Sequence, residues 1–167
     1  MKVLVAFASR HHSTQEIAEV IAKQLTENDV DVDLRRADAV ADIAGYQAVV
    51  LGSAVYMGAW LPAAWSFVER FRTTLETIPV WLFSSGPIGF ENAVPQGSPS
   101  KLAELMQATQ ARDHQIFAGK LDSKCLSLGE RLVTKVIRPP EGDFRDWESI
   151  HNWAEGIGAS LQPQNAH

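Results

Sequence analysis

The chain alternates between short apolar runs and segments in which apolar residues recur at helical spacing. Three continuous apolar runs are typical of strands buried on both faces of a parallel sheet; they are residues 3–7, 48–51 and 80–83. Residues 30–34 alternate between apolar and acidic positions, which predicts a strand nearer the sheet edge. A fifth strand is predicted over residues 116–121.

Helical segments separate and follow these strands. Apolar side chains recur every three or four positions in residues 14–25, 61–75, 100–110 and 147–161. Pro62 suits the first turn of the second segment, and Ser13 or Thr14 is expected to cap the first. Strands that alternate with helices predict an α/β fold of three layers, in which helices cover both faces of a doubly wound, five-stranded parallel sheet.

Three polar or glycine-containing loops leave the carboxyl ends of predicted strands. They are residues 9–14, 52–60 and 84–91. In parallel α/β sheets, ligands bind beyond the carboxyl ends of the strands. We therefore expect one site, assembled from loops that lie far apart along the chain.

Composition limits the class of protein. The chain has 167 residues, of which 46% are hydrophobic, and a formal net charge of −5. These values suit a single globular domain over residues 1–162 and give no general attraction to nucleic acid. Cys125 is the only cysteine, so no intrachain disulfide is expected. Neither a signal peptide nor a run of about 20 apolar residues is present, so we expect a soluble, cytoplasmic protein.

The first loop, Ser9 to Thr14, is a candidate anion site. It precedes a helix N-terminus, where exposed amides and the helix dipole favour negative charge. Ser9, Ser13 and Thr14 add hydroxyl donors, and Arg10 adds positive charge, so a phosphate monoester is the natural ligand. The alternative is an ordinary loop whose hydroxyl groups only cap the helix.

Other ligands fit this loop less well. The patterns GxxxxGK[ST] and GxGxxG are absent, which excludes a P-loop nucleotide hydrolase and disfavours a dinucleotide. The strand ends lack the carboxylates of a phosphoacceptor receiver domain. His11 and His12 are adjacent and have no third ligand at a suitable spacing, so no metal site is expected.

The six residues Ser9-Arg10-His11-His12-Ser13-Thr14 resemble the phosphate loop of the flavodoxin-type FMN-binding proteins. Ser9 and Thr14 match the family pattern, whereas His12 stands where the family usually has glycine. Glycine at this place permits unusual backbone angles and a close approach to the phosphate. The resemblance implies a flavodoxin-like sheet of strand order 2-1-3-4-5 and FMN as the cofactor, bound by this loop.

A narrower resemblance, to the quinone-dependent protoporphyrinogen dehydrogenases of bacteria, covers nearly the whole chain. It rests on VLGSAVYMGAW (50–60), IFAGKLD (116–122), ERLVTKVI (130–137) and FRDW (144–147). It implies an FMN-dependent oxidoreductase of heme biosynthesis. Such an enzyme takes electrons from a porphyrinogen-like small molecule and passes them through FMN to a quinone.

The second and third loops are expected to hold the flavin ring, which is flat, apolar on its faces and polar at one edge. In the second loop we assign cofactor contacts to Ala54, Val55, Tyr56, Met57, Gly58 and Trp60. In the third loop we assign them to Ser85, Gly86, Pro87 and Gly89. The alternative for Tyr56 and Trp60 is that they close the core, and the alternative for Gly86 and Gly89 is a turn with positive φ.

A basic amphipathic segment, residues 124–138, lies within a helical insertion that we expect at about 123–140. A segment of this kind can contact an anionic membrane surface or an acidic partner, and it can also meet substrate carboxylates. We therefore expect peripheral contact with the inner face of the cell membrane. The alternative is a helix that packs on the domain and leaves its charged side in water.

The final helix is expected to be capped by Asp143 or Asp146 and anchored to the sheet by Phe144 and Trp147. The tail, residues 163–167, is expected to be frayed.

Two other functions stay open from the sequence. A one-electron carrier of flavodoxin type would bind FMN and would not depend on a quinone. A degenerate flavodoxin-like module would have lost FMN and would act as a binding partner. His12 is the feature that keeps this last alternative open.

Overall fold

A computed structural model describes residues 1–86, 101–121 and 142–162, and five parallel strands form its centre. In chain order they are β1 (Lys2–Ala8), β2 (Asp31–Arg36), β3 (Ala48–Tyr56), β5 (Val80–Ser85) and β6 (Asp113–Phe117). They lie side by side in the order β2-β1-β3-β5-β6. The predicted α/β class and the order 2-1-3-4-5 of the five parallel strands are both confirmed.

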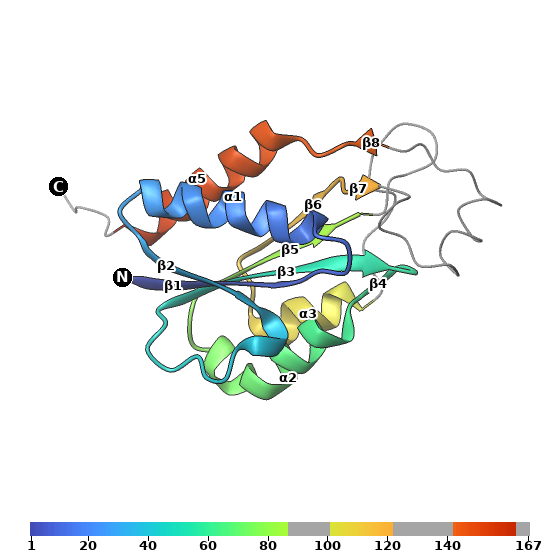
Figure 1. Cartoon of the computed structure of the whole chain (residues 1–167). Coiled ribbons are helices and arrows are strands. Elements are labelled where there is room, and N and C mark those ends of the chain that lie inside the picture. Colours follow the sequence, from blue (N-terminus) through green and yellow to red (C-terminus); the bar gives the residue numbers. More distant parts are fainter. Residues whose placement is uncertain (87–100, 122–141, 163–167) are drawn as a thin grey trace.

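Helices cover both faces of this sheet (Figure 1). One face carries α1 (Ser13–Glu27) and α5 (Trp147–Leu161), and the other carries α2 (Pro62–Leu75) and α3 (Leu102–Thr109). Side chains alternate between the two faces along a strand. The apolar run of β1 therefore contributes to both cores, with Val3, Val5 and Phe7 on the α1 side and Leu4, Ala6 and Ala8 on the α2 side.

A glycine in the middle of β3 makes room for an aromatic cluster on the α5 side. A Cβ atom at Gly52 would overlap the ring of Phe83. The same ring lies 6.1 Å, centroid to centroid, from each of Phe117 and Trp153. The Trp153 indole also donates a hydrogen bond of 2.7 Å to Asp113, which ties α5 to β6.

Strand β3 is longer than predicted. It continues past residues 48–51 to Tyr56, and an antiparallel turn then leads into β4 (Ala59–Trp60). The polar residue Ser53 is tolerated inside the strand because its hydroxyl is satisfied there. It donates to the carbonyl of Ala54 (2.9 Å) and accepts from the amide of Leu61 (3.0 Å).

The last strand of the main sheet begins and ends earlier than predicted. Instead of residues 116–121, β6 spans Asp113–Phe117, and its polar residues Asp113 and His114 have hydrogen-bond partners on α5 and β5. Lys120–Leu121 forms a separate short strand, β7. It pairs antiparallel with β8 (Gly142–Asp143), beyond the edge of the main sheet.

The helix starts agree with the sequence only in part. The expected cap of α1 by Ser13 or Thr14 is wrong, because both residues lie buried within the first turn and His12 is the N-cap. At α5, Asp146 is the N-cap, and its carboxylate accepts a hydrogen bond of 3.1 Å from a first-turn amide. A short 3₁₀ helix, η1 (Ala37–Ala39), follows β2.

Several predicted features lie outside the described residues. They are the insertion at 123–140 with its amphipathic part 124–138, the tail 163–167, and the loop residues Pro87 and Gly89.

Candidate functional site

The site lies at the carboxyl edge of the sheet, where loops from distant parts of the chain meet (Figure 1). The amide of Lys120 donates a hydrogen bond of 3.0 Å to the hydroxyl of Ser13, and the amide of Gly86 donates one of 3.0 Å to the carbonyl of Phe117. A Cβ atom at Gly119 would lie 3.3 Å from the backbone of Gly86 and 3.7 Å from the Ser13 hydroxyl. The first and third predicted loops are therefore in contact, through the segment that follows β6.

The first loop contains a left-handed residue directly before the start of α1. His12 adopts a left-handed conformation with φ 63°, which glycine adopts most readily. The chain turns tightly here, since the amide of Ser13 donates to the carbonyl of His11 at 2.8 Å. The first amides of a helix have no intrahelical acceptor, so the start of α1 presents donors to an anion.

The hydroxyl of Ser9 is the clearest sign of a ligand. Its Oγ is buried, and within the described part of the structure it has no hydrogen-bond partner. Leaving a buried polar group unsatisfied costs about 1–3 kcal/mol. Ser13 differs, because its Oγ already accepts from Lys120 and so keeps its own hydrogen for an acceptor. Two hydroxyl groups of this loop are thus prepared to donate.

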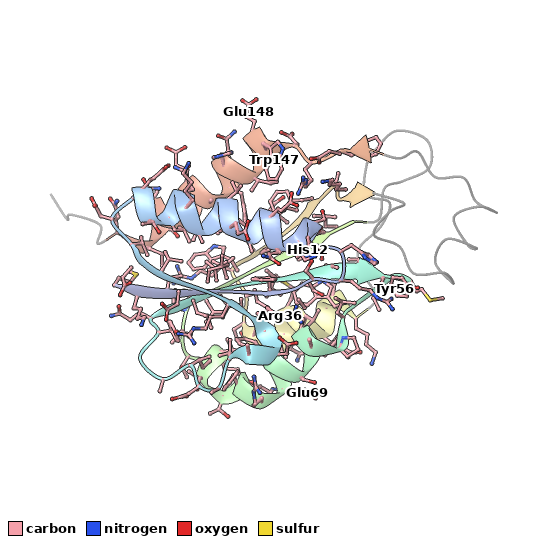
Figure 2. The ribbon with its side chains drawn as sticks, viewed as in Figure 1. His12, Arg36, Tyr56, Glu69, Trp147 and Glu148 are labelled. Carbon is pink, nitrogen blue, oxygen red and sulfur yellow. The ribbon has the colours of Figure 1, made fainter. Side chains whose placement is uncertain are left out.

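The second loop is a β hairpin with an exposed apolar tip. Met57 and Gly58 have φ angles of 50° and 78°, as in the tight two-residue turns of hairpins. Tyr56 is 42% exposed and Met57 is 92% exposed. The guanidinium of Arg10, from the first loop, lies 4.4 Å from the centroid of the Tyr56 ring. Figure 2 shows His12 and Tyr56 at the same end of the molecule.

The remaining residues predicted to contact the cofactor are more enclosed. Ala54 and Val55 are partly buried in β3, and Ser85 is buried at the end of β5. Gly86 follows with φ 79°. Trp60 is only 3% exposed, and its indole donates a hydrogen bond of 2.7 Å to Ser84. Its burial favours the alternative that it closes the core, whereas Tyr56 and Met57 present open surface.

The sequence analysis did not assign a role to three residues in the strands next to the hairpin: Ser53 of β3, Ser84 of β5 and His114 of β6. Both serines are fully buried, and the hydroxyl of Ser84 is also bonded to Nε2 of His114 at 2.8 Å. Burial lowers the pKa of His114, while the charge of Asp113 opposes this shift. The available signal was a hydroxyl residue inside an apolar strand, which needs a partner when it is buried.

A buried arginine fixes the start of α1. The Arg145 side chain is 3% exposed and forms ion pairs with Asp143 of β8 and Glu16 of α1. Its Nε donates to Asp143 at 2.7 Å, and its guanidinium lies 4.3 Å from the centroid of the Trp147 ring. The hydrogen bonds from Arg145 hold the pKa of Asp143 below its usual value. Arg145 of the FRDW segment thus holds the first turn of α1, the helix that follows the candidate anion site.

In residues 1–86, 101–121 and 142–162, no three His, Cys, Asp or Glu side chains form a group that would hold a metal ion. No helix in the same residues is long and apolar enough to cross a membrane.

Comparison with known proteins identifies the family. The flavodoxin domain matches residues 4–147 of this chain. The chain belongs to the flavodoxin family. Among curated relatives, protoporphyrinogen IX dehydrogenase [quinone] of Escherichia coli K12 is 26% identical over 171 aligned positions, which cover 94% of each protein.

Solved structures agree on the flavodoxin fold. An archaeal flavodoxin has a TM-score of 0.64 at 17% identity, with 96% of this chain and 98% of that one covered. A short-chain flavodoxin associated with a PDU bacterial microcompartment has a TM-score of 0.66 at 14% identity, with 97% and 99% covered. Rubredoxin oxygen:oxidoreductase of Desulfovibrio gigas has a TM-score of 0.65 at 19% identity, and the match covers 96% of this chain and 36% of that one.

The residues present fit the phosphate of a flavin mononucleotide. The fold of the flavodoxin family implies a flavin, and this chain offers the partnerless Ser9 hydroxyl, the Ser13 hydroxyl and the start of α1. His12 has the positive φ that glycine adopts most readily. The tip residues Tyr56 and Met57 offer apolar surface at the same edge.

Proposed function

We propose that this flavodoxin-family chain binds FMN at the carboxyl edge of its sheet. The phosphate lies in the loop Ser9–Thr14, where it accepts hydrogen bonds from hydroxyl groups and from first-turn amides. The ring lies between the hairpin tip and the segment that begins at Ser85. The observation that carries the proposal is the buried Ser9 hydroxyl with no partner in the described residues, because phosphate oxygens would satisfy it.

We further propose that the chain is an FMN-dependent oxidoreductase that resembles the quinone-dependent protoporphyrinogen dehydrogenases. Bound FMN would accept two electrons from a reduced substrate and deliver them to an acceptor. The chain supplies placement: Ser9 and Ser13 orient the phosphate, and Tyr56 and Met57 shield part of the ring from water. Support for a porphyrinogen-like substrate and a quinone acceptor comes from the 26% identity to the Escherichia coli enzyme across 94% of the chain.

A coupled assay tests this proposal. Purified protein loaded with FMN is mixed under anaerobic conditions with protoporphyrinogen and a soluble quinone, and porphyrin fluorescence is followed. We expect fluorescence to rise only when FMN and quinone are both present. The Ser9→Ala variant should need more FMN to reach the same rate.

The outcomes separate the three functions. If the protein exchanges electrons with a redox partner but does not oxidise porphyrinogen in a quinone-dependent reaction, its function is that of an electron carrier and not of this enzyme. Failure to bind FMN at all would leave a binding module. Contact of residues 124–138 with anionic membranes stays a separate proposal, tested by cosedimentation with vesicles.

A further inference from the structure

The hairpin that carries Tyr56 and Met57 has little support of its own. β4 has two residues, and among the described residues it pairs with β3 alone, through Val55 with Trp60 and Tyr56 with Ala59. Met57 sits in a left-handed conformation, which strains a residue with a side chain. A short strand with a strained turn needs an anchor elsewhere if its tip is to keep one position.

Two buried serines provide that anchor. Ser53 of β3 and Ser84 of β5 are register partners on neighbouring strands, and both are fully buried. Each binds one of the two consecutive residues that end the hairpin. The amide of Leu61 donates to Ser53 at 3.0 Å, and the indole of Trp60 donates to Ser84 at 2.7 Å.

His114 extends this arrangement to the edge strand β6. An indole N–H can only donate, so the Ser84 oxygen accepts from Trp60, and the same hydroxyl is hydrogen-bonded to Nε2 of His114, 2.8 Å away. The Ser84 hydroxyl has one hydrogen and a second lone pair available for this bond. We assign the donor role to Ser84, which places the hydrogen of a neutral imidazole on Nδ1. Partial burial of His114 favours this neutral form.

We propose that Ser84 and His114 are positioning residues for the flavin ring. Through the Trp60 indole they fix the hairpin, and the hairpin fixes Tyr56 and Met57 against the ring. The inference rests on the proposed FMN binding, and it adds a chain of hydrogen bonds that begins at a strand remote from the tip. These hydrogen bonds act on the position of the ring and not on the phosphate. Their loss should therefore lower the affinity for riboflavin and for FMN by the same factor.

The test compares Ser84→Ala, Trp60→Phe and the double variant. In flavin-free protein, hydrogen exchange reports on residues 54–61; fluorescence titration with FMN and with riboflavin reports on the ring. We expect Ser84→Ala to speed hydrogen exchange in the hairpin but not in β1. The same variant should lower the affinity for each flavin by about tenfold. In the Trp60→Phe background, which has no indole donor, Ser84→Ala should change affinity by less than about twofold.

Two further variants separate positioning from general weakening of the fold. His114→Gln keeps an acceptor near Nε2 and should retain wild-type affinity and the visible circular dichroism of bound flavin. His114→Leu fills a similar volume without an acceptor. This variant should therefore show a lower flavin affinity and lose the visible circular dichroism of bound flavin. Unchanged hairpin exchange in Ser84→Ala, or equal losses in the Gln and Leu variants, would overturn the inference.

A third arm keeps failure of the inference distinct from failure of the proposed function. Ser9→Ala should lower the affinity for FMN and leave the affinity for riboflavin unchanged, since riboflavin has no phosphate. If the wild-type chain binds neither flavin, the proposed function and the role of the hairpin toward a ring are both wrong. If wild type binds and Ser84→Ala binds equally well, only the positioning role is wrong.

Discussion

His12 combines a side chain with a backbone conformation that suits glycine better. Its φ of 63° places it in the left-handed region, and its imidazole makes a long contact of 3.4 Å with the side chain of Gln15. The sequence raised the question of whether histidine here had destroyed the phosphate loop. In the structure His12 adopts the left-handed conformation at some cost in strain, and α1 begins directly after it at Ser13.

Replacing His12 with glycine should release that strain. We expect His12→Gly to raise the free energy of unfolding by about 1 kcal/mol and to leave FMN affinity unchanged or improved. Urea denaturation and flavin titration measure the two effects. His12→Ala is the matched control, because it removes the imidazole but keeps a Cβ atom, and it should give no such gain.

His114 should make stability depend on pH. Burial lowers its pKa from the ordinary 6.5, so the unfolded chain binds more protons than the folded chain between the two pKa values. The contribution of His114 is therefore complete above the unfolded pKa and is lost as the pH falls through the folded pKa.

Urea unfolding of wild type and His114→Gln across this range measures the contribution of His114. The variant should lose less stability on acidification than wild type. Parallel pH profiles for the two proteins would contradict the assignment of a neutral His114 in the folded state.

At the scale of elements, the sequence predicted the strands buried on both faces better than those that carry polar residues. β1 and residues 80–83 of β5 are apolar runs buried between two helical layers, so burial alone identifies them. The second half of β3 and the start of β6 contain Ser53, Asp113 and His114, which are tolerated because other elements supply hydrogen bonds. Such partners are distant along the chain, so a local pattern does not contain them.

The junction of β8 and α5 illustrates the same limit. The sequence predicted that Phe144 and Trp147 would anchor the last helix. Trp147 does pack against the core, but Arg145 is the most buried residue of the segment and joins it to Glu16 of α1. An isolated arginine between aromatic residues gives no indication of a carboxylate partner more than a hundred positions away.

Removing the Arg145 guanidinium should loosen α1 from α5. We expect Arg145→Met to lower the free energy of unfolding by about 2 kcal/mol, because hydrogen bonds to charged groups are lost. Its partners Asp143 and Glu16 are each 40% exposed and can be hydrated, so the loss stays below that of a fully buried pair. Urea denaturation measures it, and a change below about 0.5 kcal/mol would show that the pairs contribute little.

At the scale of the molecule, the candidate site joins residues that are far apart in the sequence. The first loop, the hairpin and Gly86 meet at one edge only when the whole sheet is assembled, and the bond from Lys120 to Ser13 links positions 107 residues apart. A ligand held at this edge binds the folded chain and not the unfolded chain. Cofactor binding should therefore stabilise the entire domain.

Thermal unfolding tests this coupling. At a free FMN concentration 100 times the dissociation constant, the expected gain is about 2.7 kcal/mol, which corresponds to a rise in Tm of about 5–10 °C for a chain of this size. Riboflavin at the same concentration should give a smaller rise. A Tm that does not move with FMN would contradict the proposed site.

The pairing of β7 with β8 has a consequence for how this protein can be divided. Lys120 and Leu121 lie beside Asp143 and Gly142, so the two ends of the segment 122–141 are next to each other. Residues 122–141 can therefore be replaced by a short reverse turn while every strand of the main sheet keeps its neighbours. If the shortened protein still turns yellow with FMN but no longer sediments with anionic vesicles, surface attachment and electron chemistry reside in separable modules of one small polypeptide.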